Sequence, residues 1–295
     1  MMLMVKPGME LIKGAVDMHV HVGPDAVPRL MDCLQLAEEA KAVGARGFVF
    51  KSHSMPTAPL AILARRIVPE VEVFGSLVLN NSVGGLNPSA VETSLKFEAK
   101  VIWMPTSSAK NHIEYYAKYP HPLGLGGQRE RGICVLDKSG ELVEEVKTIL
   151  GLIADAKAVL ATAHLSIPET RVLMVEAKKA GVKNIVVSHP LDGMINMSMD
   201  DQMEMVKLGA YLEHTLLSTM PIWRSTSPAE IYRVIKTTGA EHNILVTDFG
   251  QVHHPSPFEG LRLFARTMLE FGLSKEEIDK LIRGNPCNLL GLDKG

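Results

Sequence analysis

Several features that would assign this chain to a common class are scarce or missing. The 295 residues include only three cysteines, Cys33, Cys134 and Cys287. They lie far apart, are odd in number, and none belongs to a Cys-x-x-Cys motif. The sequence therefore argues against a disulfide framework and indicates a reducing compartment.

Long apolar runs are also missing. The first residues, MMLMVKPGME, contain too short an apolar run for a signal peptide. No segment reaches the roughly 18 uncharged apolar residues that a membrane helix needs. We therefore expect a cytoplasmic protein that has no membrane partner.

A charge excess of either sign is lacking as well. The formal net charge is -2, which gives no electrostatic reason to expect binding to nucleic acid or to an anionic membrane. The content of 46% hydrophobic and 22% charged residues is ordinary for a soluble globular protein. We expect the partner to be a small-molecule substrate, and the sequence leaves a homo-oligomer open.

What the chain does contain is a regular alternation of short apolar runs and amphipathic helical segments. The runs are rich in β-branched residues, which is typical of strands that are covered on both faces. Eight such runs are found, at 15–21, 46–53, 71–80, 99–105, 157–164, 183–189, 209–215 and 243–248. Eight strand-helix units predict an α/β protein with a closed (β/α)₈ TIM barrel, formed as one domain by residues 1–295.

Residues 106–140 interrupt this alternation between the fourth and fifth strands. They include the proline- and glycine-rich stretch YPHPLGLGG, and the pattern predicts a short hairpin around 137–140. An insertion at this end of a barrel would overhang the catalytic face, so we interpret it as a lid or substrate loop. A surface loop without a role in catalysis is the alternative.

A His-x-His motif lies in the first predicted strand. Side chains alternate between the two faces of a strand, so His19 and His21 point the same way. Two imidazoles at this spacing suit one divalent ion such as Zn²⁺, although a complete site needs further ligands. The motif alone is weak, because chance or a structural use explains it equally well.

Further metal-ligand residues follow later strands. His164, His189 and Asp248 stand at the ends of the fifth, sixth and eighth strands. In a barrel the carboxyl ends of all strands meet at one rim. A buried structural histidine or a turn-forming Asp explains any one of them, but five such residues at the ends of four strands predict a metal site.

At these positions the sequence resembles the amidohydrolase superfamily of metal-dependent hydrolases. That family carries His-x-His after strand one, histidines after strands five and six, and an Asp after strand eight of a distorted (β/α)₈ barrel. The final segment, KEEIDKLIRGNPCNLLGL, is also similar to the end of the family's chains. The resemblance implies a barrel of this type along essentially the whole chain.

The fourth strand departs from the family pattern. Binuclear members usually bridge their metals with a carboxylated Lys or a Glu there, whereas this chain reads VIWMPT. Lys51 at the end of strand two is our candidate bridge, because a lysine buried in a barrel is costly unless it is paired or chemically converted. A Lys51 that pairs with a carboxylate or binds a substrate anion is the alternative. In that case one ion would be held by His19, His21, Asp248 and one later histidine.

These residues predict a metal-dependent hydrolase with one or two divalent ions, most simply zinc. A metal-activated water would cleave an amide, cyclic amide, lactone or related bond, and Asp248 would shuttle the proton, as the resemblance also implies. Substrate-binding candidates are His53, Arg129, His253 and His254. A phosphoesterase of the polymerase-and-histidinol-phosphatase type is a rival, although its Asp-x-His is absent. A barrel that binds a ligand without turnover is the other rival.

Overall fold

Eight parallel strands form in the part of the chain that this computed structural model describes, residues 7–120, 132–223 and 225–292. Each strand pairs with the next one in the sequence, which is the order of a TIM barrel. Their bounds are β1 Val16–Val20, β2 Gly47–Phe50, β3 Glu72–Val78, β4 Val101–Trp103, β5 Val159–Ala161, β6 Asn184–Val187, β7 Tyr211–Thr215 and β8 Asn243–Val246. The predicted barrel is confirmed, and each strand is found within its predicted range.

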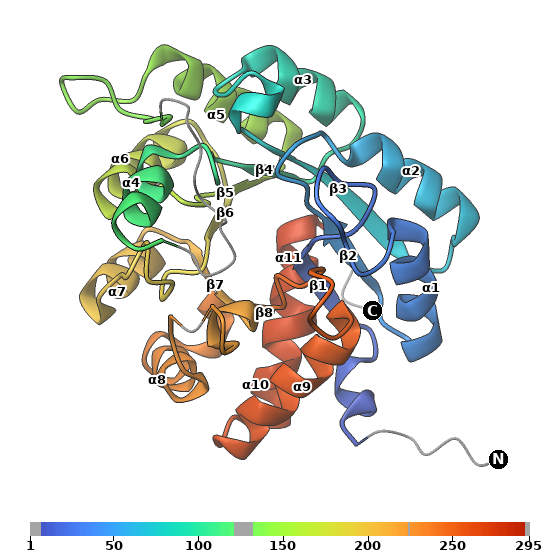
Figure 1. Cartoon of the computed structure of the whole chain (residues 1–295). Coiled ribbons are helices and arrows are strands. Elements are labelled where there is room, and N and C mark those ends of the chain that lie inside the picture. Colours follow the sequence, from blue (N-terminus) through green and yellow to red (C-terminus); the bar gives the residue numbers. More distant parts are fainter. Residues whose placement is uncertain (1–6, 121–131, 224, 293–295) are drawn as a thin grey trace.

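The helices surround the strands (Figure 1). Their bounds are α1 Cys33–Val43, α2 Ala58–Ile67, α3 Pro88–Lys96, α4 Lys110–Lys118, α5 Glu144–Ala156, α6 Ile167–Lys179, α7 Met199–Lys207, α8 Pro228–Thr238, α9 Pro257–Glu270, α10 Lys275–Asp279 and α11 Asn285–Leu290. A π-helical turn, η5 Lys280–Gly284, joins the last two. Ser274 and Glu277 form a capping box at the start of α10.

The barrel is closed by hydrogen bonds between the end of β1 and the segment that follows β8. The backbone N–H of Asp248 donates to the carbonyl of His19 at 2.9 Å, and the N–H of His21 donates to the carbonyl of Phe249 at 2.8 Å. These bonds fix the segment after β8 against the His-x-His motif. Barrel closure and the placement of the candidate ligands therefore depend on the same hydrogen bonds.

The hydrophobic core lies between the strands and the helices that cover them. One part packs β4, β5 and β6 against α3, α5 and α6, with Ile102, Leu160 and Leu173 fully buried. The other packs β1, β2 and β8 against α1 and α9, with Phe48 and Phe264 fully buried. This burial on the outer faces explains why the strand segments are almost continuously apolar. Among the described helices, none has the length and apolarity needed to cross a membrane.

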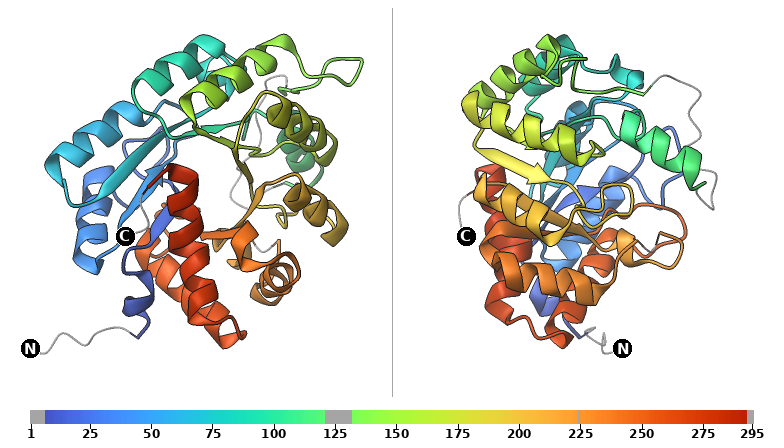
Figure 2. Two further views of the ribbon diagram at one scale, coloured as in Figure 1. Left: turned by 180° about the vertical axis from the view of Figure 1, so that it is seen from behind. Right: turned by 90° about the vertical axis from the view of Figure 1, so that its left-hand side faces the viewer.

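The segment between β4 and β5 contains α4 and a short antiparallel bridge between Leu136 and Leu142. The N–H of Asp137 donates to the carbonyl of Glu141 at 2.8 Å, which confirms the predicted hairpin. The side view of Figure 2 shows α4 on the side of the molecule toward which the strand arrows point. Residues 121–131 of the predicted insertion lie outside the described residues.

Candidate metal centre

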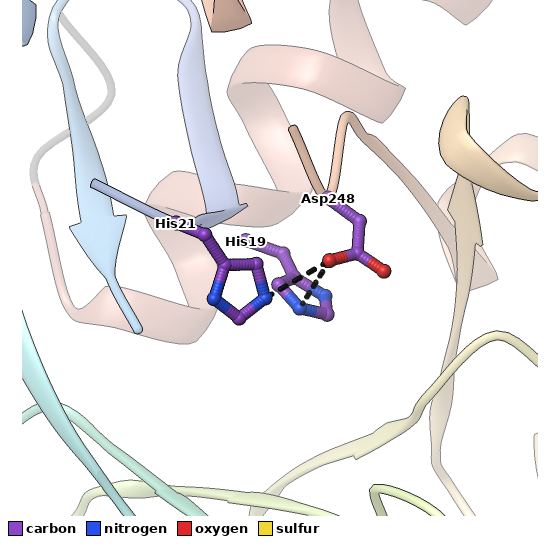
Figure 3. A group of neighbouring side chains, drawn as sticks. All are labelled: His19, His21 and Asp248. Carbon is purple, nitrogen blue, oxygen red and sulfur yellow. Dashed lines mark ion pairs between the residues drawn. The ribbon is translucent and has the colours of Figure 1, made fainter. Parts of the chain in front are cut away.

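Three predicted ligands meet at the carboxyl end of the barrel. Nε2 of His19 and Nε2 of His21 lie 3.1 and 3.0 Å from the same oxygen, Oδ1 of Asp248. Figure 3 shows both rings turned toward that oxygen, while the other carboxylate oxygen points away from them. Donor atoms of the three residues all lie within 4.8 Å of one another. Two imidazoles and a carboxylate at this separation are a donor set for a divalent ion.

The backbone at two of the strand ends is unusual. Asp248 has a φ of 57° and His189 a φ of 28°, values that non-glycine residues rarely adopt. Such conformations persist where the surrounding structure enforces them, and they often occur at functional sites. Gly250 has a φ of 144°, and a Cβ at this position would lie 1.5 Å from the carbonyl oxygen of His21. The turn after β8 can thus approach β1 only with a glycine here.

Glu213 of β7 orients one of the two histidines. Its Oε1 lies 3.2 Å from Nδ1 of His19, and both side chains are buried. A carboxylate that accepts a hydrogen bond from Nδ1 leaves Nε2 free to act as a ligand, which is the usual arrangement around metal-binding histidines. No motif in the sequence marks Glu213 as a site residue.

Lys51 reaches the centre from the end of β2. It is 1% exposed, and its Nζ lies 2.9 Å from Nε2 of His19. The ammonium also lies 4.1 Å from the ring centroid of Trp103 at the end of β4. Burial lowers the pKa of Lys51 to about 8, although Asp248 and Glu213 oppose the shift.

His164 and His189 lie beside the group of His19, His21 and Asp248, which we call the trio. The ring of His189 is 6.2 Å from that of His19 and 5.1 Å from that of His164, measured between centroids. Nδ1 of His164 lies 2.8 Å from Nδ1 of His112 on α4, and the two rings stack. Burial, and to a smaller extent the charge of His112, holds the pKa of His164 well below its ordinary value. A neutral imidazole is the form that binds a metal.

The charges around the trio favour a cation placed between its three side chains. Burial lowers the pKa of His19, but the carboxylates of Asp248 and Glu213 outweigh this and raise it. Burial raises the pKa of Asp248, but His19 and His21 outweigh this and hold it well below its ordinary value. The pKa of His21 falls to about 3 because of burial and the nearby Arg29. Asp248 is therefore ionised at neutral pH.

The predicted substrate-binding residues occupy different environments. His53 stacks on His21 at 4.7 Å between ring centroids, and its Nδ1 lies 2.8 Å from Oγ1 of Thr106. His254 is buried and stacks on Phe249, and neither of its ring nitrogens has a hydrogen-bond partner among the described residues. His253 is exposed. His53 thus adjoins the trio directly.

Arg129 lies outside the described residues. Arg29, which sequence analysis did not select, reaches the trio from the segment after β1. Its Nη2 lies 3.4 Å from Nδ1 of His21, and the Asp25 carboxylate holds the guanidinium at 2.7 Å. No motif marked Arg29, because its approach depends on how the β1–α1 segment folds back over the barrel end.

The fold and the arrangement of these side chains can be compared with known proteins. Residues 14–213 match the model of the family of unknown function DUF6282, and the chain belongs to this family. A comparison with curated protein sequences finds no match.

Solved structures with the same fold include an amidohydrolase from Pseudomonas aeruginosa, at 11% identity and a TM-score of 0.63, covering 96% of this chain and 97% of that one. A probable dipeptidase, PvdM, from the same organism is 12% identical with a TM-score of 0.62, covering 97% and 96%. A phosphotriesterase homology protein from Escherichia coli is 13% identical with a TM-score of 0.60, covering 95% and 99%. At these identities the similarity establishes the TIM-barrel fold.

Proposed function

We propose that this protein is a metal-dependent hydrolase that cleaves an amide, cyclic amide, lactone or related bond of a small molecule. The observation that carries the proposal is the convergence of the His19 and His21 Nε2 atoms on Oδ1 of Asp248, at 3.1 and 3.0 Å. The related barrels include an amidohydrolase and a probable dipeptidase, which supports the choice of reaction class.

The residues present fit a divalent ion, for which zinc is our choice. The trio offers two imidazole nitrogens and one carboxylate, and Glu213 directs the His19 ring so that Nε2 faces the other donors. Nδ1 of His189 is buried and has no hydrogen-bond partner among the described residues. A buried polar atom without a partner is costly, so this nitrogen is available as a further ligand. His164 would complete the set.

When bound, such an ion supplies Lewis acidity, which lowers the pKa of a water molecule and polarises a carbonyl group. In our proposal Asp248 orients the attacking water, accepts its proton and returns the proton to the leaving group. Its side chain is 15% exposed, against 1% for His19 and 2% for His21, so water reaches the carboxylate more readily than the two rings.

We also propose that Lys51 carries a carbamate. The neutral amine would attack CO₂ to form a C–N bond, and the displaced proton would pass to solvent. The buried position of Lys51 and its 2.9 Å contact with Nε2 of His19 support a role in the metal site. A carbamate there would replace the bridging ligand that β4 lacks. A crystal map that shows an unmodified amine in protein kept under CO₂ would end this part of the proposal.

Metal analysis of the purified protein tests the central claim. We expect at least one equivalent of Zn, Mn, Fe or Co per chain, and a loss of that metal when His21 is replaced by Ala. A panel of N-acyl amino acids, hydantoin-like rings and lactones would then be screened before and after removal of the metal with a chelator. Absence of stoichiometric metal, or turnover that resists complete metal removal, would refute the proposed function.

A further inference from the structure

A cavity opens beside the metal centre. Its volume is about 370 Å³, which is within the size range of small-molecule sites. Its walls come from α4 and from the segments after β6 and β7, and they include Tyr115, Tyr116, Tyr119, Asp192, Gly193 and Trp223. Nothing in the predicted metal chemistry uses these side chains. We call this cavity the tyrosine pocket.

The tyrosine pocket adjoins two of the predicted metal ligands. Oδ2 of Asp192 lies 3.9 Å from Nδ1 of His189. On the other side, the ring of Tyr116 lies 4.7 Å from that of His112, which stacks in turn on His164. The tyrosine pocket is thus separated from the predicted ligands by few side chains, so one substrate could span both sites.

The aromatic rings of the pocket meet at steep angles. Tyr115 and Tyr116 are inclined at 87° with centroids 5.2 Å apart, and Tyr115 and Tyr119 at 47° with centroids 5.1 Å apart. Several aromatic rings that line one cavity at different angles resemble the aromatic cages that bind quaternary ammonium groups. The ring geometry is therefore compatible with an ammonium group.

The charged residue that lines the tyrosine pocket also favours an ammonium group. Among the described lining residues Asp192 provides a carboxylate, and no Lys or Arg is present. Lys118, which is not a lining residue, places its ammonium 5.1 Å from the ring centroid of Tyr119. Arg224, between Trp223 and Ser225, lies outside the described residues. Gly193 allows the phenol of Tyr115 to approach this loop, because a Cβ there would lie 2.7 Å from Oη of Tyr115. The aromatic wall and the carboxylate are thereby held next to each other.

We propose that the tyrosine pocket binds an ammonium group of the substrate, held by the tyrosine faces and by the carboxylate of Asp192. The substrate class would thus be a cationic amide, lactone or related compound, with its positive charge next to the bond that is cleaved. The substrate class rests on the proposed function, whereas the binding of a cation to the tyrosine pocket does not depend on that function.

The test measures binding of choline to the metal-free protein by calorimetry, without turnover. Two probes of similar shape serve as comparisons: the neutral carbon isostere of choline and the anion trimethylacetate. We expect choline to bind more tightly than either. Asp192→Asn should weaken choline binding about tenfold or more, and Tyr119→Leu about two- to fivefold, in line with a charge–charge attraction and a cation–π contact. Asp155→Asn, on the exposed side of α5, is the matched control and should change nothing.

Equal binding of the neutral isostere, tighter binding of the anion, or unchanged choline affinity in Asp192→Asn would each overturn the cation pocket. These outcomes are independent of the hydrolase proposal, because neither metal nor turnover enters the measurement. Conversely, a protein that binds choline as expected but contains no metal in its purified form would refute the proposed function and leave the pocket intact. A fold check by circular dichroism on each variant separates lost binding from lost structure.

Discussion

Oε1 of Glu213 lies 3.2 Å from Nδ1 of His19, and each of the two side chains is 1% exposed. The other carboxylate oxygen of Glu213 is buried and has no hydrogen-bond partner among the described residues. This contact joins β7 to β1 across the interior of the barrel. It fixes the orientation of the His19 ring, so that Nε2 faces Asp248 rather than solvent.

Replacement of Glu213 by Gln should therefore weaken metal binding without removing a direct ligand. We expect a loss of affinity of about 10- to 100-fold, the usual effect of removing a carboxylate behind a ligating histidine. Competition with a chromophoric chelator measures it. Glu145→Gln, exposed on α5, is the control and should bind metal like the wild type. Unchanged affinity in Glu213→Gln would show that the contact has no role in the metal site.

The fold was predictable because parallel strands covered on both faces must be apolar along almost their whole length. The ends of the strands were less predictable. The predicted strand 71–80 ends at Val78 in β3, because Asn80 turns away to bind the next segment. Its Oδ1 accepts from the N–H groups of Thr106 and Ser108, at 2.8 and 3.2 Å. Such a tertiary contact leaves no periodic signal in the sequence.

The candidate site was predictable where ligand-type residues end a strand. His19, His21 and Asp248 follow from strand position alone, and the structure brings these three together. Glu213 was not selected because it lies within β7, and only the barrel register places it against His19. His112 was not selected either, since α4 belongs to the insertion and its position against His164 depends on tertiary packing.

Asp248→Asn tests the proposed proton shuttle. The amide keeps the shape of the side chain but cannot accept a proton, so we expect kcat to fall by about 10²- to 10⁴-fold. Because Asp248 also faces the two histidines, metal content must be measured in the same preparation and the rate expressed per bound ion. Asp155→Asn provides the matched control. A variant that retains its metal and full activity would remove Asp248 from the mechanism.

Gly250→Ala tests the close approach of the β8 turn to β1. A Cβ at this position would lie 1.5 Å from the carbonyl oxygen of His21, and the φ of 144° is strained for any other residue. We expect a loss of stability of more than about 2 kcal/mol, together with weaker metal binding because His21 must move. Gly151→Ala within α5 meets no atom within 4 Å and should stabilise the protein by up to about 1 kcal/mol. Urea unfolding measures both, and equal effects would contradict the steric argument.

Asp17 makes the stability of the protein depend on pH. Burial raises its pKa to about 7, although hydrogen bonds from Thr247 and His19 oppose the shift. Because the folded state holds this proton more tightly than the unfolded chain does, the contribution of Asp17 to stability is complete below about pH 4 and is lost as the pH rises through about 7. Between these values one such group changes the free energy of unfolding by up to about 1.4 kcal/mol per pH unit.

Asp17→Asn should remove this dependence, since the amide keeps the acceptor for the two backbone N–H groups and offers an N–H to the Thr247 hydroxyl. Urea unfolding of the metal-free wild type and variant from pH 4 to 8 isolates the effect, because the other titrating groups largely cancel in the difference. The variant should gain stability relative to the wild type as the pH rises toward 7, and the difference should level off above it. A constant difference over this range would mean that Asp17 is ionised in the folded protein throughout.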